Sequence, residues 1–227
     1  MHIGKYVFAQ FIEFLPQKAF QRIVMKYRGD KYIKSFSCWN QLLIMVYGQL
    51  SGCDSLRELV CIITAHAPKS YHLGFGKSAI TRSNLSKANA NRNSKIFEEF
   101  AYKMISVAQE KRITKEFEIS AKHVALLYKY RWQVELFFKW IKQHLHIKSF
   151  WGVTENAVRI QIFSAITAYC LVAIIEHDLR LNRSTFDVLR ILSMSLFDKT
   201  PIRELFKRIE KVDDMPENSH VQLCFNF

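Results

Sequence analysis

Apolar residues recur along most of the chain with the three- and four-residue spacing of an amphipathic helix. Ser55 and Thr154 stand where a helix N-cap is expected, and Pro16 divides two short segments. A loose alternation of apolar and charged residues from Ile113 to Ile119 predicts a short strand. The pattern therefore predicts a mainly α protein with at most one or two short strands and with helices at 6–15, 17–27, 36–50, 56–64, 78–91, 95–112, 121–148, 155–181, 185–196 and 201–211.

Two segments need separate interpretations. Residues 66–76 contain Pro68, Gly74 and Gly76, which predict a loop. The apolar helix 155–181 includes sixteen uncharged residues from Ile160 to Ile175. That run is short for a membrane span and contains polar side chains, so it predicts a buried helix and no membrane partner.

Charge narrows the choice of partner. The 227 residues carry 33 Lys and Arg against 20 Asp and Glu, a net charge of +13. Residues 1–40 hold seven basic and two acidic side chains, and residues 69–112 hold nine and three, whereas residues 151–227 hold nine and ten. A concentrated basic excess favours nucleic acid, although a solvated basic surface remains the alternative. Five cysteines without a CxxC pair, and an N-terminus unlike a signal peptide, predict reduced thiols and a cytoplasmic protein.

The segment 78–91 is the predicted recognition helix. Arg82, Ser83, Asn84 and Lys87 supply donors of the kind that reach base edges or phosphates, and Ser86 and Asn89 also remain for solvent or a ligand. Two further cations after it, Arg92 and Lys95, are predicted to contact the DNA backbone. The preceding loop is longer than the tight turn of a helix-turn-helix, so phosphate attraction without base reading stays open.

A second polar stripe lies on the predicted helix 121–148. At about 100° per residue, Tyr128, Arg131, Glu135 and Lys142 fall on one side of it, and Lys139 lies close by. Arg131 and Glu135 could be no more than a surface ion pair at i, i+4.

The spacing Tyr-x2-Arg-x3-Glu-x6-Lys resembles the Y-R-E-K signature of bacterial insertion-sequence transposases of the DDE type. Residues 51–59 and 83–89 look like the helical domain that precedes the catalytic core in one branch of these enzymes. The resemblance implies a ribonuclease-H-like core holding two Mg²⁺ or Mn²⁺ ions, with double-stranded DNA at the element ends as partner. It implies that Glu135 is a metal ligand and that Tyr128, Arg131 and Lys142 lie near the cleaved strand. Lys139, on the same helix side, is predicted to bind nucleic acid.

The family also implies two metal-binding aspartates on strands before the glutamate helix. Here the aspartates before Glu135 are Asp30, in a turn, and Asp54, at a helix start. We therefore expect an internal deletion, no stably bound metal and no unaided cleavage. The expected organisation is a helical DNA-binding domain at 1–112, a helical remnant of the core at 113–211 and a tail at 212–227, with dimerisation or pairing with an intact copy. An active metal-dependent transposase and a helical DNA-binding regulator unrelated to transposition are the alternatives.

Overall fold

The computed structural model describes residues 4–76, 79–116, 150–181, 183 and 185–213. These residues form ten helices and no strand, which confirms the mainly α prediction for the described part of the chain. The helices are α1 (Val7–Ile12), α2 (Gln17–Lys26), α3 (Cys38–Leu50), α4 (Leu56–Ala65), α5 (Ala67–Ser70), α6 (Arg82–Asn91), α7 (Lys95–Glu116), α9 (Glu155–Leu179), α10 (Thr185–Ser195) and α11 (Ile202–Asp213).

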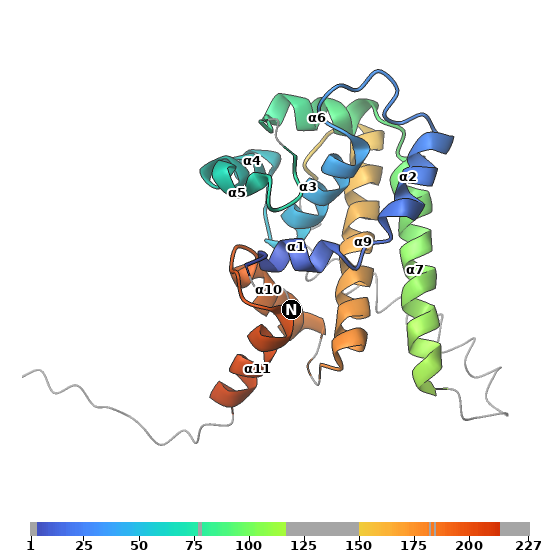
Figure 1. Cartoon of the computed structure of the whole chain (residues 1–227). Helices are drawn as coiled ribbons and strands as arrows, with labels where there is room; N and C mark the ends of the chain where they lie inside the picture. Colours follow the sequence, from blue (N-terminus) through green and yellow to red (C-terminus); the bar gives the residue numbers. More distant parts are fainter. Residues whose placement is uncertain (1–3, 77–78, 117–149, 182, 184, 214–227) are drawn as a thin grey trace, which may run out of the picture.

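Three long helices make the frame of the protein. α9 lies between α3 and α7 and contacts both (Figure 1). α3 is apolar on nearly every side because other helices surround it, and eleven of its residues are buried. α6 lies across one end of α9, whereas α10 and α11 lie toward the other end. One continuous core of buried side chains runs from α1 to α11.

Side-chain caps fix where several helices begin. Ser37, Ser55, Thr81 and Thr154 each accept a hydrogen bond from a backbone N–H in the first turn of α3, α4, α6 and α9. Such a cap satisfies one of the backbone donors that a helix start leaves unpaired. The predicted starts at Ser55 and Thr154 are confirmed, whereas α6 begins after Thr81 and is shorter than the predicted segment 78–91.

Two local predictions are wrong. Residues 113–116 continue α7, so the predicted strand does not form there, and its remaining residues lie outside the described part of the chain. Extending an existing helix is easier than starting a new element, and four alternating residues are too few to oppose it. Residues 66–76 contain α5 as well as loop, because Pro68 falls in the first helical turn, where its missing N–H costs nothing.

The long apolar helix is mostly internal. α9 is the one described helix long and apolar enough to cross a membrane, but 67% of its most apolar stretch is buried inside the protein. The predicted boundary at residue 112 falls inside α7, which runs without a break to Glu116. The division into two domains stays a prediction.

Candidate nucleic-acid interface

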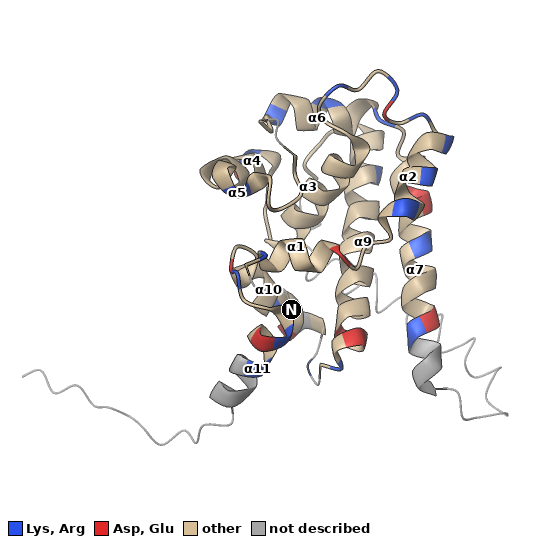
Figure 2. Cartoon of the chain, in the orientation of Figure 1, with Lys and Arg blue, Asp and Glu red and all other residues tan. Residues whose placement is uncertain are grey.

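One side of α6 is a polar surface. Leu85, Ala88 and Asn89 face the core and are buried. The opposite side is exposed and includes Ser86 as well as the four residues that we call the α6 face: Arg82, Ser83, Asn84 and Lys87. Figure 2 shows basic residues on α6 and on the neighbouring loop between α2 and α3 at the same end of the molecule. The sequence-predicted recognition residues therefore lie together and open to solvent.

The start of α6 borders a shallow hollow against α4. This hollow, of about 600 Å³, is lined by Arg57 and Arg82 together with small and apolar residues of α4. Arg57 and Arg82 are both exposed. Two guanidinium groups from different helices can each bind a phosphate oxygen, so they suit a phosphate backbone passing over α4 and α6.

Arg92 behaves differently from the other predicted cations. It is only 9% exposed. Its guanidinium donates to the backbone oxygens of Phe36 and Ser37 and to Oε1 of Gln41, the last two at 2.9 Å. The group also lies over the Phe36 ring, 5.1 Å from its centre. Burial lowers the pKa of Arg92, but an arginine keeps its charge in proteins.

This geometry gives Arg92 a structural role rather than the phosphate contact that the sequence predicted. It joins the end of α6 to the segment that leads into α3. Lys95, the other cation predicted to contact the backbone, is exposed at the first position of α7.

A set of buried and partly buried amide side chains holds α6 in place, and sequence reasoning missed it. The Gln41 side chain donates to Oδ1 of Asn89, at 2.6 Å. Asn156 of α9 donates to the backbone oxygens of Asn89 and Arg92, and its own oxygen accepts from Ser94 N. These residues are spread over more than a hundred positions, so no local spacing signals them. Polar residues at core-facing positions of helices were the available sign.

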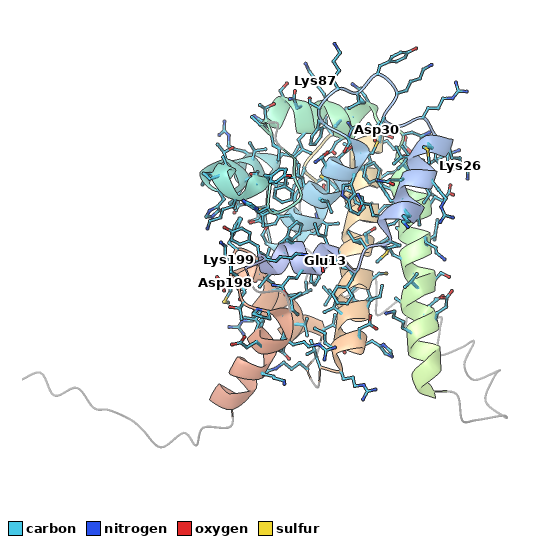
Figure 3. The ribbon with its side chains drawn as sticks, viewed as in Figure 1. Glu13, Lys26, Asp30, Lys87, Asp198 and Lys199 are labelled. Carbon is cyan, nitrogen blue, oxygen red and sulfur yellow. The ribbon has the colours of Figure 1, made fainter. Side chains whose placement is uncertain are left out.

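The loop between α2 and α3 carries a second group of cations. Arg28, Lys31 and Lys34 are all exposed there. Lys26, at the end of α2, pairs instead with Glu99 of α7 at 2.8 Å. The hydrogen bond between them raises the pKa of Lys26 and lowers that of Glu99. Figure 3 places Lys26 and Lys87 toward the same end of the molecule.

The predicted catalytic residues cannot be placed. Tyr128, Arg131, Glu135, Lys139 and Lys142 all lie outside the described residues. Their grouping on one helix side therefore stays a prediction.

The described residues do not fit a metal centre. No group of three or more His, Cys, Asp or Glu side chains comes together within the part of the chain that the structure describes. Asp30 accepts a hydrogen bond from Cys38 N at 2.7 Å, and thus serves the start of α3. Asp54 lies just before α4, where its backbone N–H donates to Glu58.

Two family models match parts of the chain. Residues 3–76 match a domain of unknown function, and residues 64–171 match a transposase DDE domain. Over residues 64–171 the chain is therefore similar to the transposase DDE domain. The matched range contains α5, α6, α7 and most of α9, and also the positions of the predicted Y-R-E-K residues. The α6 face belongs to the matched stretch.

Three individual proteins that are similar to parts of this chain are named as transposases. A protein of Sinorhizobium fredii named as a transposase is 52% identical over 85 residues, which are 37% of this chain and 21% of that protein. A protein of Geobacillus stearothermophilus named as the transposase of insertion sequence element IS5377 is 48% identical over 59 residues, 26% of this chain and 16% of the relative. A third, from Synechocystis and named for element IS4SA, is 34% identical over 87 residues, 38% of this chain and 26% of the relative. The alignments thus span about a quarter or less of these relatives. No solved structure matches the chain.

Proposed function

We propose that this chain binds the double-stranded DNA ends of an insertion sequence through the α6 face and does not cut DNA by itself. The observation that carries the proposal is the exposure of Arg82, Ser83, Asn84 and Lys87 on one helix side within the stretch related to DDE transposases. The catalytic part of the proposal rests on the Y-R-E-K resemblance and on the positions of the aspartates.

The chemistry of the α6 face suits duplex DNA. Arginine and lysine neutralise phosphates, and asparagine and serine can hydrogen bond to base edges in a groove. α6 spans ten residues, about 15 Å, which is long enough to lie along a major groove about 12 Å wide. Arg57 on α4 extends the basic surface toward a neighbouring phosphate.

The proposed loss of cleavage follows from the number of carboxylates. Two metal ions that clamp a phosphodiester need several carboxylate ligands, because Mg²⁺ prefers oxygen. Glu135 would supply one of them. Asp30 is hydrogen bonded to the backbone at the start of α3, and Asp54 lies at the start of α4. An internal deletion that removed the β-sheet carrying the two aspartates would explain why these carboxylates are missing. A protein of this kind could still act by forming a dimer or by pairing with an intact copy of the transposase.

Duplex binding is tested by removing the two cations of the α6 face. The double variant Arg82→Gln/Lys87→Gln is compared with Arg203→Gln/Lys207→Gln, which removes the same charge from exposed positions on α11, at the other end of the molecule. Affinity for a duplex carrying the element's terminal repeat is measured by fluorescence anisotropy at several salt concentrations. We expect the α6 variant to lower the magnitude of the salt slope by about 2 and the α11 variant to change it little.

Equal effects of the two double variants would refute the α6 face as the binding surface. Cleavage is tested separately, with the full chain, Mg²⁺ or Mn²⁺, and the same duplex. We expect no nicking. Nicking that disappears in Glu135→Ala would refute the proposed inactivity but would leave the duplex-binding surface intact.

A further inference from the structure

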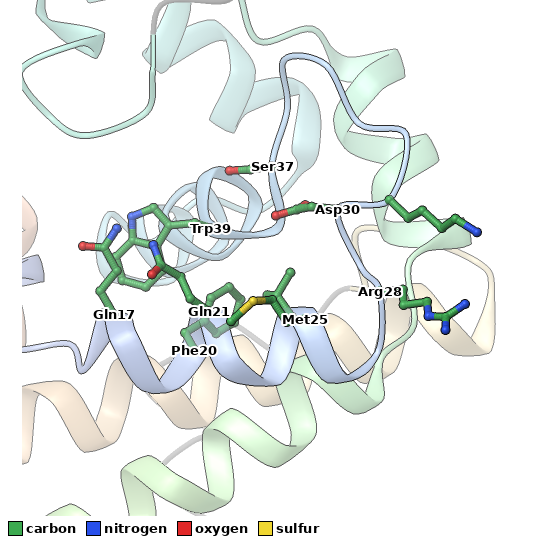
Figure 4. Close-up of a pocket in the computed structure, with 10 residues that line it drawn as sticks. Gln17, Phe20, Gln21, Met25, Arg28, Asp30, Ser37 and Trp39 are labelled. Atoms are coloured by element: carbon green, nitrogen blue, oxygen red, sulfur yellow. The ribbon is translucent and has the colours of Figure 1, made fainter.

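A groove of about 790 Å³ lies between α2 and the segment that leads into α3 (Figure 4). We call it the α2 groove. Its volume is within the range of small-molecule sites, about 300 to 1,000 Å³. Its floor and sides combine aromatic, amide and flexible apolar side chains, among them Gln17, Phe20, Gln21, Met25 and Trp39.

One end of the α2 groove is aromatic. Trp39 is partly exposed and packs against Phe20, with ring centres 5.5 Å apart. Phe20 is fully buried, so it supports the indole from behind and leaves the Trp39 side chain as the surface that a ligand meets. Gln17 and Gln21 are exposed beside it and offer amide donors and acceptors.

The other end is basic. Arg28 and Lys31 line the α2 groove and are exposed. Figure 4 shows Arg28 at the end away from Gln17 and Trp39. Asp30 is the acid among the lining residues, and the hydrogen bond from Cys38 N ties it to the start of α3. Arg28 has φ of 52° and is not glycine, a backbone conformation that persists only where its surroundings hold it.

From this arrangement we propose that the α2 groove binds a single-stranded stretch of nucleic acid, with one base stacked on Trp39 and the phosphates near Arg28 and Lys31. A stacking aromatic beside a basic track is how proteins hold unpaired strands. In a duplex the base faces are already stacked, so a tryptophan inside a hollow can reach only an unpaired base.

The length of the α2 groove agrees with this ligand. α2 has ten residues and is about 15 Å long, and stacked nucleotides advance about 3.4 Å each. The stretch between the aromatic and basic ends therefore corresponds to roughly four nucleotides. Met25 is 69% exposed at the rim, where its flexible side chain can adapt to different bases.

This site shares no residue with the α6 face. It rests on the proposed function only in taking nucleic acid as the partner, and it adds unpaired DNA, such as a frayed or overhanging end, to the ligands of the chain. A second copy of the chain packing an apolar helix into the α2 groove is the competing occupant, but it would leave Arg28 and Lys31 without use.

The test uses the full chain and a labelled oligothymidylate single strand, measured by anisotropy. Arg28→Gln/Lys31→Gln is compared with Lys18→Gln/Arg22→Gln, which removes the same charge from exposed positions of α2 that do not line the groove. We expect the first variant to lower the magnitude of the salt slope by about 1.4, and the second to change it little. Trp39→Leu should weaken binding about tenfold at unchanged salt slope, and Trp39→Phe should retain most of it.

A 2-aminopurine base in the strand gives a second readout, because stacking on an indole quenches its fluorescence. Wild type should quench it and Trp39→Leu should not, at saturating protein. Equal salt slopes for the two charge variants would overturn the proposal. So would a Trp39→Leu protein that binds like wild type, or one that changes from dimer to monomer in gel filtration with unchanged affinity. Arg82→Gln/Lys87→Gln should keep single-strand binding, so failure of the duplex proposal and failure of this one are distinguishable.

Discussion

The α6 face and the α2 groove carry similar charge but are built in opposite ways. The α6 face is one side of a capped helix, with its cations and amides projecting into solvent. The α2 groove is a hollow with a tryptophan at one end and two cations at the other. A net charge of +13 predicts attraction to polyanions but does not distinguish these surfaces. Their shapes do, since a projecting helix suits a groove of a duplex and a lined hollow suits an unpaired strand.

Arg92 connects the two surfaces. It follows the last residue of α6, and its guanidinium binds the carbonyl oxygens of Phe36 and Ser37, one of which lines the α2 groove. The sequence places Arg92 among the cations that would meet DNA. In the folded chain it instead fixes the position of the residues that we propose as DNA contacts.

The largest expected effect comes from breaking this connection. Arg92→Met removes three hydrogen bonds donated by a charged group, and it leaves the partly buried carbonyl oxygens of Phe36 and Ser37 and the buried side chain of Gln41 without that donor. We expect a loss of about 3 kcal/mol in the free energy of unfolding, measured by urea denaturation. At temperatures where the variant is folded, duplex and single-strand affinity should fall together.

Arg92→Lys is the matched control for charge. It keeps the cation but cannot reproduce the planar fork of the guanidinium, so it should also destabilise the protein. Arg92→Met could instead keep full stability and lose only duplex affinity. Arg92 would then be a DNA contact, and it would not be the residue that connects the α6 face with the α2 groove.

The sequence predicted the helices better than the side-chain contacts between them. Helix starts at Ser55 and Thr154 could be found because a cap is a local signal. The strand expected at 113–119 was wrong over 113–116, since a short alternating pattern also fits the surface of a helix that is already formed. The exposure of Arg82, Ser83, Asn84 and Lys87 followed from helical spacing alone.

The buried roles of Arg92, Asn89 and Asn156 could not be predicted. Each depends on partners from helices far apart in sequence, and polar residues near a basic segment suggest DNA contacts by default. The α2 groove was missed for the same reason. Trp39 and Arg28 line opposite ends of one groove only because the chain between α2 and α3 folds back over α2. Neither residue has a distinctive neighbour along the chain.

A smaller effect is expected at the first turn of α6. Thr81→Ala removes the oxygen that accepts from Asn84 N at 3.1 Å, and should cost about 1 kcal/mol of stability. Because Arg82, Ser83 and Asn84 form that turn, duplex affinity should fall while single-strand affinity stays the same. Ile202→Val is the matched control, since trimming this buried side chain of α11, at the other end of the molecule, should cost about 1 kcal/mol. If both variants lowered duplex affinity equally, the effect would come from stability and not from the α6 face.

The smallest effect is expected far from both surfaces, at the ion pair between Lys111 of α7 and Asp178 of α9. Burial alone would raise the pKa of Asp178, but the hydrogen bonds from Lys111 and His177 outweigh it and lower the pKa. Stability from this pair is therefore present above the unfolded pKa, about 3.9, and is lost as the pH falls through the lower folded value. Asp178→Asn should cost about 0.5 kcal/mol at pH 7 and almost nothing once the pH is below the lowered pKa of the folded state, as measured by urea denaturation across pH. The affinities for duplex and for single-stranded DNA should both stay at wild-type values, because neither the α6 face nor the α2 groove depends on this ion pair. A loss of either affinity would show that stability alone controls binding.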